Sequence, residues 1–395
     1  MPQLIEMDGT ANMSSASVKF CNADFNSACA VSLPSLSVIV LNYKAEELTT
    51  RCLWSVAESD YRGPLEIILV DNGATASSIV VLKALAQALP CPVSVVHCER
   101  NLGFTGGVLA AWPHANGELI CLLNNDALVH PRCLTTLAEK LKDHTDIGAV
   151  WPYDAPLCWH TELKVPQSSE VALMRNGTHS VTGANMWLPL LRDYRQCFTG
   201  SGVCMVFAKR TVEYPFPEEY FAYFEDVFLG WTLQLKGLRV ERVPEAVIYH
   251  AGSATASKHP GLRPLLAFHA EKNRLANLLV FYSWFTLVRL MPLLVVAELA
   301  NLVGSLVALL SSEPTSARIK AHIASRMWLI GHIGWLLRLR KQLQQVRKVQ
   351  DHRIISLLSA RLTMQDGRLG KLLNSFSLTY CRLVGIRTVE LISQT

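Results

Sequence analysis

Short apolar stretches alternate with amphipathic segments through the first third of the chain. Apolar-rich stretches of strand length occupy residues 36–41, 65–70, 93–97 and 119–123. Between them, residues 45–58 and 78–88 place apolar side chains at helical spacing. Strands that are apolar at nearly every position are typical of a parallel sheet whose two faces are both covered by helices. The pattern therefore predicts an α/β fold with a doubly wound, mostly parallel sheet.

Polar residues stand directly after three of these stretches. They are Asn42-Tyr43-Lys44, Asp71-Asn72-Gly73 and Asn124-Asn125-Asp126. In open α/β sheets, ligands bind in the crevice at the carboxyl ends of the strands. A carboxylate flanked by two amides suits a hard divalent cation that carries phosphates. Taken alone, the triplet that ends at Asp126 is more typical of a turn.

A second group of candidate catalytic residues lies about a hundred positions further on. The stretch Phe221-Ala-Tyr-Phe-Glu-Asp-Val-Phe228 surrounds two adjacent acids, Glu225 and Asp226, with aromatic side chains. Desolvation and mutual repulsion raise the pKa of at least one acid in such a setting, which suits a general base. The alternative is an acidic helix start, which contributes only about 0.3–1 kcal/mol.

The sequence pattern predicts further elements between residues 101 and 250. They are a glycine-containing loop at 101–107 that enters a helix, a helix at 131–143, a strand at 147–151, an irregular segment at 154–195, a strand at 203–208, a helix at 229–235 and a strand at 247–250 that ends in His250.

Charge is spread unevenly over the 395 residues, although the net charge is only +5. Residues 256–395 hold 19 Lys or Arg against 6 Asp or Glu, so this region carries +13 and the rest of the chain −8. An apolar, basic region favours an anionic membrane surface as partner. Nucleic acid is not expected, because no recognition motif accompanies the charge. The eleven dispersed cysteines indicate reduced thiols in a cytosolic compartment.

Three regions follow from these patterns. Residues 1–34 are expected to form a loosely ordered tail without the basic and apolar parts of a secretory signal, residues 35–274 an α/β domain, and residues 275–395 a helical, membrane-associated region. Charged residues and a proline divide residues 275–310 into runs shorter than a bilayer span, so interfacial helices are favoured over spanning ones. Residues 317–350 read as a basic amphipathic helix for an anionic lipid surface.

Four motifs in this order carry a family resemblance. They are Val40-Leu-Asn-Tyr43, Val70-Asp-Asn72, Asn101-Leu-Gly-Phe104 and Leu123-Asn-Asn-Asp126. Together with Glu225-Asp226 and His250, this set resembles the inverting family 2 glycosyltransferases of GT-A fold, in particular bacterial rhamnosyltransferases that build surface polysaccharides. The resemblance runs from about residue 36 to about residue 274.

The resemblance implies a role for each candidate residue. Asn42, Asp71, Asn72, Asn101, Gly103 and Asn125 would bind the nucleotide sugar, Asp126 and His250 would bind Mg²⁺ or Mn²⁺, Asp226 would be the general base, and Glu225 would orient Asp226 or contact the acceptor. Asn124 stands where the family often has the first Asp of its Asp-x-Asp. A segment Lys272-Asn273-Arg274 would either direct its cations at phosphate or form a solvated helix face.

The implied protein is a metal-dependent transferase on the cytoplasmic face of a bacterial membrane. Its donor would be a nucleoside-diphosphate sugar, with dTDP-L-rhamnose favoured and a UDP-sugar as the other choice. Its acceptor would be a polyprenyl-diphosphate-linked saccharide, and a homo-oligomer is left open. The alternative is a catalytically degenerate nucleotide-sugar-binding or scaffold protein, because Phe228 and Thr232 replace an acid and an arginine that are common in the family.

Overall fold

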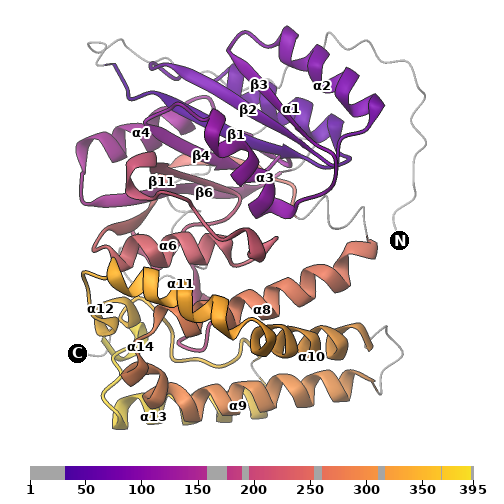
Figure 1. The fold of residues 1–395 in the computed structure, drawn as a ribbon. Coiled ribbons are helices and arrows are strands. Elements are labelled where there is room, and N and C mark those ends of the chain that lie inside the picture. Colours follow the sequence, from indigo (N-terminus) through magenta and orange to yellow (C-terminus); the bar gives the residue numbers. More distant parts are fainter. Residues whose placement is uncertain are drawn as a thin grey trace.

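The chain forms a mixed sheet with helices on both faces and a further stack of helices beyond one of them (Figure 1). This computed structural model describes residues 32–157, 176–188, 195–252, 260–309, 316–365 and 367–392. Residues 1–31 of the expected tail and much of the irregular segment at 154–195 lie outside these ranges.

The sheet is mostly parallel, as the sequence predicts, and its strands follow the order β3-β2-β1-β4-β10-β6-β11-β5. These strands are β1 (Leu36–Asn42), β2 (Leu65–Asn72), β3 (Val93–Cys98), β4 (Leu119–Leu123), β5 (Ala127–Val129), β6 (Ile147–Pro156), β10 (Cys204–Ala208) and β11 (Arg239–His250), with β9 (Gln196–Cys197) paired to β11. Strand β10 runs antiparallel between β4 and β6. The strand predicted at 247–250 is the end of the much longer β11, and β5 is a strand that the sequence pattern misses.

Successive residues of the central strands enter two different cores. Val38 and Val40 of β1 pack on one face, whereas Ile39 packs on the other. Both faces must therefore be covered, which explains the nearly continuous apolar runs in the sequence. The covering helices are α1 (Glu46–Ala57), α2 (Ala76–Ala88), α3 (Gly103–Ala111), α4 (Cys133–Asp143) and α6 (Glu225–Leu235).

The C-terminal helices continue one of these two cores. Leu278, Phe281, Leu290 and Leu336 belong to the same apolar cluster as Ile39 of the sheet. The helices are α8 (Arg263–Phe281), α9 (Trp284–Leu309), α10 (Ser316–Gly331), α11 (Ile333–Gln345), α12 (Asp351–Ile355), α13 (Arg368–Leu383) and α14 (Val389–Ile392). In Figure 1, α9 and α13 form the layer furthest from the sheet.

Two expectations about this region need correction. The single basic helix expected at 317–350 is two helices, α10 and α11, which are separated at His332. The apolar segment at 275–310 is not a series of short helices, because α9 continues through Pro292 for 26 residues. Its part Trp284–Gly304 is long and apolar enough to cross a membrane, by length and composition alone, with a mean hydropathy of 1.8 and 17% of the most apolar window buried.

Candidate active site

The carboxyl ends of the central strands open onto a cavity of about 600 Å³. Asp126 after β4 and Asp226 at the start of α6 both line it. The end of a sheet strand carries the first and the first turn of α6 carries the second, so two acids that are distant in sequence share one cavity. Asn72, Asn101 and Gly103 line the same cavity.

An amide network fixes the wall expected to hold the donor. Asn72 Nδ2 donates to Asn101 Oδ1 (3.2 Å) and to the Gly103 carbonyl (2.9 Å), and Asn72 Oδ1 accepts from the Leu102 amide (2.8 Å). Asn101 Oδ1 also accepts from the Gly103 amide (2.8 Å). Buried polar groups with this degree of pairing are held in one orientation. The network therefore places the loop at 101–103 before any ligand arrives.

Asn42 and Asp71 lie behind this wall and are not among the residues that line the cavity. Asp71 is 1% exposed, and its two carboxylate oxygens accept hydrogen bonds from Asn42 Nδ2 (3.3 Å) and Ser78 Oγ (2.7 Å). His97 Nδ1 lies 3.5 Å from Asp71 Oδ2. Contact of Asp71 with a base stays a prediction, and it requires a ligand to reach past or displace these partners.

Gly103 connects the two walls of the cavity. Its φ of +73° is in the left-handed region, and a Cβ there would lie 2.4 Å from the Phe221 carbonyl oxygen. Thr105, two residues further along in α3, donates its amide proton to the same carbonyl (3.0 Å). Residue 103 must therefore be glycine, because it adopts a left-handed conformation and because the Phe221 carbonyl approaches it closely.

Asp126 and His250 are brought together because β5 and β11 pair next to them. The pairing sets Ala127 opposite His250, and His250 Nε2 lies 3.4 Å from Asp126 Oδ1. On the other side, His250 Nδ1 lies 3.3 Å from Asp154 Oδ2. Burial lowers the pKa of His250, but the two carboxylates outweigh it and raise the pKa to about 9.

The side chains at Asp126 and His250 supply only some of the ligands that a divalent cation needs. Among the described residues no group of three or more His, Cys, Asp or Glu side chains is arranged to hold a metal ion. Asp126 and His250 supply one carboxylate and one imidazole, and imidazole suits Mn²⁺ better than Mg²⁺. A cation held here would take further oxygen ligands from the diphosphate of a donor. Asn125 contributes to the architecture, because its Nδ2 donates to Thr49 Oγ1 (3.0 Å).

The acid pair at the start of α6 occupies two different environments. Asp226 is half-buried, and its carboxylate accepts from the Gly202 amide (3.1 Å) and the Val227 amide (2.8 Å). Glu225 is buried, and its Oε2 has no hydrogen-bond partner among the described residues. Burial raises the pKa of both, and repulsion from Asp226 adds to the shift of Glu225, with values of about 6 for Asp226 and about 8 for Glu225. The two acids titrate as a coupled pair, and the larger upward pKa shift of Glu225 makes it the group that keeps a proton to higher pH.

The loop before this pair is strained. Phe221, Tyr223 and Phe224 all have positive φ, between 62° and 67°. Such conformations cost about 1–3 kcal/mol each in non-glycine residues and persist only where other contacts fix them. Asn273 of α8 supplies such contacts, because its Nδ2 donates to the carbonyls of residues 220, 222 and 223. Asn277 Nδ2 donates to the Phe224 carbonyl (3.1 Å).

This arrangement corrects the interpretation of Lys272-Asn273-Arg274. All three residues are buried, so a solvated helix face is wrong, and none lines the cavity. Lys272 Nζ donates to the Glu219 carbonyl, and Arg274 pairs with acids on α8 and α9. The segment supports the loop before α6 instead of binding phosphate in the cavity.

Sequence reasoning missed Arg242 and Asp154, which also line the cavity. The Arg242 guanidinium lies over the Trp151 and Tyr153 rings, at 5.1 and 5.5 Å from their centroids. A planar cation in a cavity suits an anionic phosphate. The alternating residues of Arg239–His250 could have indicated a longer strand, but the pairing that brings it to the site is long-range.

The two departures from the family pattern lie away from the cavity. Phe228 packs against Tyr220 and Phe281, with centroids 5.3 and 5.1 Å away, and Thr232 Oγ1 donates to the Phe228 carbonyl (2.8 Å). Neither residue lines the cavity. They contribute to the core and leave the acid pair in place.

Comparison with known families and curated proteins gives consistent matches. Residues 37–189 match glycosyl transferase family 2, a range that includes Asp126 and ends before Glu225. An N-acetylglucosaminyltransferase of Bradyrhizobium diazoefficiens is 24% identical over 307 residues, which are 73% of this chain and 58% of that protein. An undecaprenyl-phosphate 4-deoxy-4-formamido-L-arabinose transferase of Sodalis glossinidius is 28% identical over 123 residues, which are 30% of this chain and 37% of that protein.

These relatives support a family 2 glycosyltransferase, but neither is named for rhamnose. The chain spans between 26% and 65% of the length of the curated N-acetylglucosaminyltransferases it matches. Among solved structures, S. aureus TarS 1-349 in complex with UDP has 15% identity and a TM-score of 0.45, and the match covers 88% of this chain and 89% of that one. A likeness this distant assigns no function.

Proposed function

We propose that this protein is an inverting glycosyltransferase that moves a sugar from a nucleoside diphosphate to a hydroxyl group. The observation that carries the proposal is the single cavity lined by Asp126, Glu225 and Asp226. The family 2 match over residues 37–189 supports the same class of reaction.

In the proposed reaction, Asp226 takes the proton of an acceptor hydroxyl. The acceptor oxygen forms a bond to the anomeric carbon as the bond from that carbon to the diphosphate breaks, and the nucleoside diphosphate leaves. Attack from the face opposite the leaving group inverts the anomeric centre. The Gly202 and Val227 amides fix the orientation of the Asp226 carboxylate. Protonated Glu225 would have an oxygen available for the acceptor, because Oε2 has no partner among the described residues.

The proposed metal site is formed by Asp126 and His250, with Mg²⁺ or Mn²⁺ as the ion. A bound cation would neutralise charge that develops on the departing diphosphate. Arg242 would contribute a second positive charge to the same cavity. Asn72, Asn101 and Gly103 would shape the nucleotide end, as their network in the cavity wall supports.

The donor and acceptor are narrower proposals. The sequence motifs favour dTDP-L-rhamnose, whereas the relatives above are named for N-acetylglucosamine and 4-deoxy-4-formamido-L-arabinose. A polyprenyl-diphosphate-linked saccharide as acceptor, on the cytoplasmic face of a bacterial membrane, would agree with the basic and apolar C-terminal region.

A donor panel tests the proposal. The purified protein would be incubated with dTDP-rhamnose, UDP-N-acetylglucosamine and GDP-sugars, each with lipid-linked saccharide acceptors, with and without EDTA. We expect transfer from one donor, its loss with EDTA, and an inverted anomeric configuration in the product by NMR. Donor binding without transfer across the whole panel would instead identify a nucleotide-sugar-binding protein, and a retained configuration would contradict the proposed mechanism.

A further inference from the structure

Helix α9 presents an unbroken apolar face to solvent. Large apolar side chains that are 48–70% exposed recur along it at helical spacing: Trp284, Phe285, Val288, Met291, Val295, Leu299 and Val303. Between Trp284 and Gly304, where the side chains of α9 are described, none of the exposed residues is charged. We call these seven residues the apolar stripe. A contiguous apolar surface of this length marks an interaction site.

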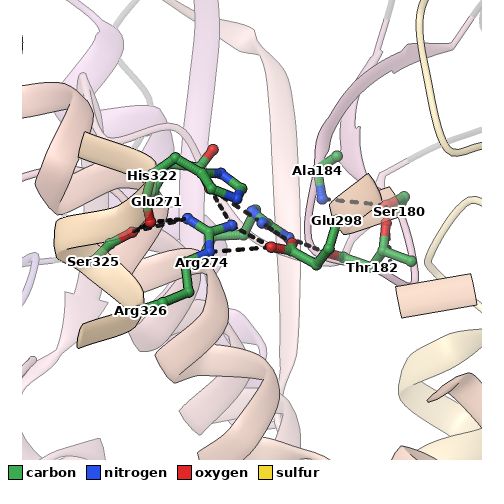
Figure 2. Close-up of polar contacts among 9 residues, drawn as sticks. All are labelled: Ser180, Thr182, Ala184, Glu271, Arg274, Glu298, His322, Ser325 and Arg326. Carbon is green, nitrogen blue, oxygen red and sulfur yellow. Dashed lines mark hydrogen bonds and ion pairs between the residues drawn. The ribbon is translucent and has the colours of Figure 1, made fainter. Parts of the chain in front are cut away.

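One flank of α9, beside the apolar stripe, is anchored by charge. Glu298 forms ion pairs with Arg274 of α8 and Arg326 of α10, and Figure 2 shows these three side chains converging between the helices. Glu271 joins the cluster through Arg274 (3.2 Å) and Arg326 (2.9 Å). Arg274 also donates to the Thr182 carbonyl (3.0 Å), which ties the cluster to the region beside the sheet.

This anchor bears on whether α9 could cross a bilayer. A helix that crossed would have to leave α8 and α10 and carry Glu298 into hydrocarbon, where an acid is costly. It would also leave Arg274, which is 5% exposed, without one of its two carboxylate partners. Breaking one side of a buried ion pair is strongly destabilising. The cluster therefore holds α9 along the surface of the protein.

Basic side chains accompany a second apolar row on the neighbouring helix. Helix α13 exposes Leu369, Leu372, Phe376 and Leu383. Arg368, Lys371 and Arg382 are exposed at helical spacing on the flank of that row. Helices α9 and α13 together form the outermost layer of the molecule in Figure 1. An apolar face bordered by cations is the pattern of a helix that lies in the interface of an anionic membrane.

We propose that the apolar stripe of α9 and the exposed row of α13 form one docking surface for an anionic lipid bilayer, with α9 lying in the plane of the membrane and not across it. The partner is a bilayer and not a second copy of this chain, because the cations that border the surface would meet like charges in a symmetric dimer. Anionic lipid headgroups complement these cations, and the lipid acyl chains contact the apolar stripe. This proposal is independent of the catalytic one, because it involves no residue of the cavity.

The experiment compares binding to preformed vesicles of phosphatidylcholine with and without phosphatidylglycerol. The purified full chain would be assayed by co-sedimentation, followed by dilution without detergent to test release. The variant is the pair Val288→Glu and Leu299→Glu, which places two acids in the apolar stripe. The control is Val80→Glu on α2, an equally exposed valine (68%) on a helix that covers the sheet.

We expect the wild type and the Val80→Glu protein to bind vesicles that contain phosphatidylglycerol and to be released on dilution. The double variant should bind at least about tenfold more weakly, because each acid must be desolvated beside like-charged lipid. If thermal unfolding shows that the double variant is misfolded, Val288→Ser with Leu299→Ser replaces it and the same loss is expected.

Three results would overturn the proposal. Equal binding of the stripe variant and the control would show that the stripe does not touch lipid. Binding that detergent alone reverses would indicate a spanning helix. A concentration-dependent dimer in sedimentation velocity that the stripe variant abolishes, without vesicle binding by the wild type, would make the surface a contact between copies of the chain.

Discussion

The two walls of the cavity are built in opposite ways. On the wall expected to hold the donor, Asn72 uses both amide atoms and Asn101 uses its oxygen in one hydrogen-bond network, and positive φ in the loop at 101–103 occurs only at a glycine. On the acid side, one buried oxygen of Glu225 has no hydrogen-bond partner in the described part of the chain, and three of the four residues before Glu225 have left-handed backbone. Strain and unmet hydrogen bonds persist where function needs them and other contacts sustain them. The difference is consistent with the proposed division of the cavity into a preformed wall for binding and a strained wall for chemistry.

Removing the proposed base should have the largest effect. Asp226→Asn keeps the size of the side chain, but its one oxygen can accept from only one of the Gly202 and Val227 amides, and it cannot take up a proton. Transfer should fall by roughly 10²- to 10⁴-fold, the usual contribution of a general base. The turnover number would be measured with the active donor and acceptor. Glu47→Gln, on an exposed part of α1, is the matched loss of one carboxylate and should leave the turnover number unchanged.

Releasing the strained loop should have the next largest effect. Asn273→Ala removes three hydrogen bonds to the loop before Glu225, so the acid pair should lose its position. We expect the turnover number to fall roughly 10- to 100-fold, because small misplacements of catalytic groups cost rate on this scale. The KM for the donor should change little.

A control separates position from general stability. Asn374→Ala on α13 also removes contacts to backbone, at residues 362 and 363, far from the cavity. It should lower the melting temperature without changing the turnover number. If both variants lose activity only in proportion to their loss of folded protein, Asn273 has no positioning role.

The pH profile should show the raised pKa of Asp226. A base must be deprotonated to act, and burial raises its pKa to about 6. Below that pH, kcat/KM should fall about tenfold per unit, and above it the profile should level off. An acid limb near pH 4, the ordinary range of an aspartate, would contradict the environment described for the pair.

The smallest effect should be that of Glu225→Gln on thermal stability, and it should depend on pH. Burial, with repulsion from Asp226, raises the pKa of Glu225 from 4.5 to about 8, so the folded state holds a proton that the unfolded state releases. Stability from this group is complete below pH 4.5 and is lost as pH rises through 8. Glu225→Gln should therefore unfold at a higher temperature than the wild type above pH 8, and at a similar temperature below pH 4.5. The exposed Glu47→Gln should show no such divergence.

Much of the donor wall could be predicted from the sequence, because it follows from local rules. Apolar runs that end in Asp71-Asn72 and Asn124-Asn125-Asp126 place polar groups at one sheet edge, and the glycine at 103 marks a tight loop. The acid pair was predictable from its aromatic surroundings. In each case the information lies within a few residues of the site.

The supports of the acid wall could not be predicted in the same way. Asn273 reaches the site through the packing of α8, and Arg242 reaches it through the register of β11. No local sequence pattern around either residue predicts this position. The left-handed backbone of the loop is unfavourable for the aromatic residues that adopt it, Phe221, Tyr223 and Phe224. The local conformational preferences of the sequence therefore predict a different loop from the one observed. For the same reason, the sequence suggested either phosphate or solvent as the surroundings of the basic segment at 272–274, whereas the fold buries it.

The most direct test of the central claim is donor affinity by calorimetry for two variants, Asp126→Asn and Asp226→Asn, with Mn²⁺ present. The account predicts that Asp226→Asn binds the donor as tightly as the wild type while transfer is lost, and that Asp126→Asn loses the part of the affinity that depends on metal. If Asp226→Asn loses donor affinity, or if it still transfers sugar at the rate of the wild type, the division of the cavity into a binding wall and a chemical wall is contradicted.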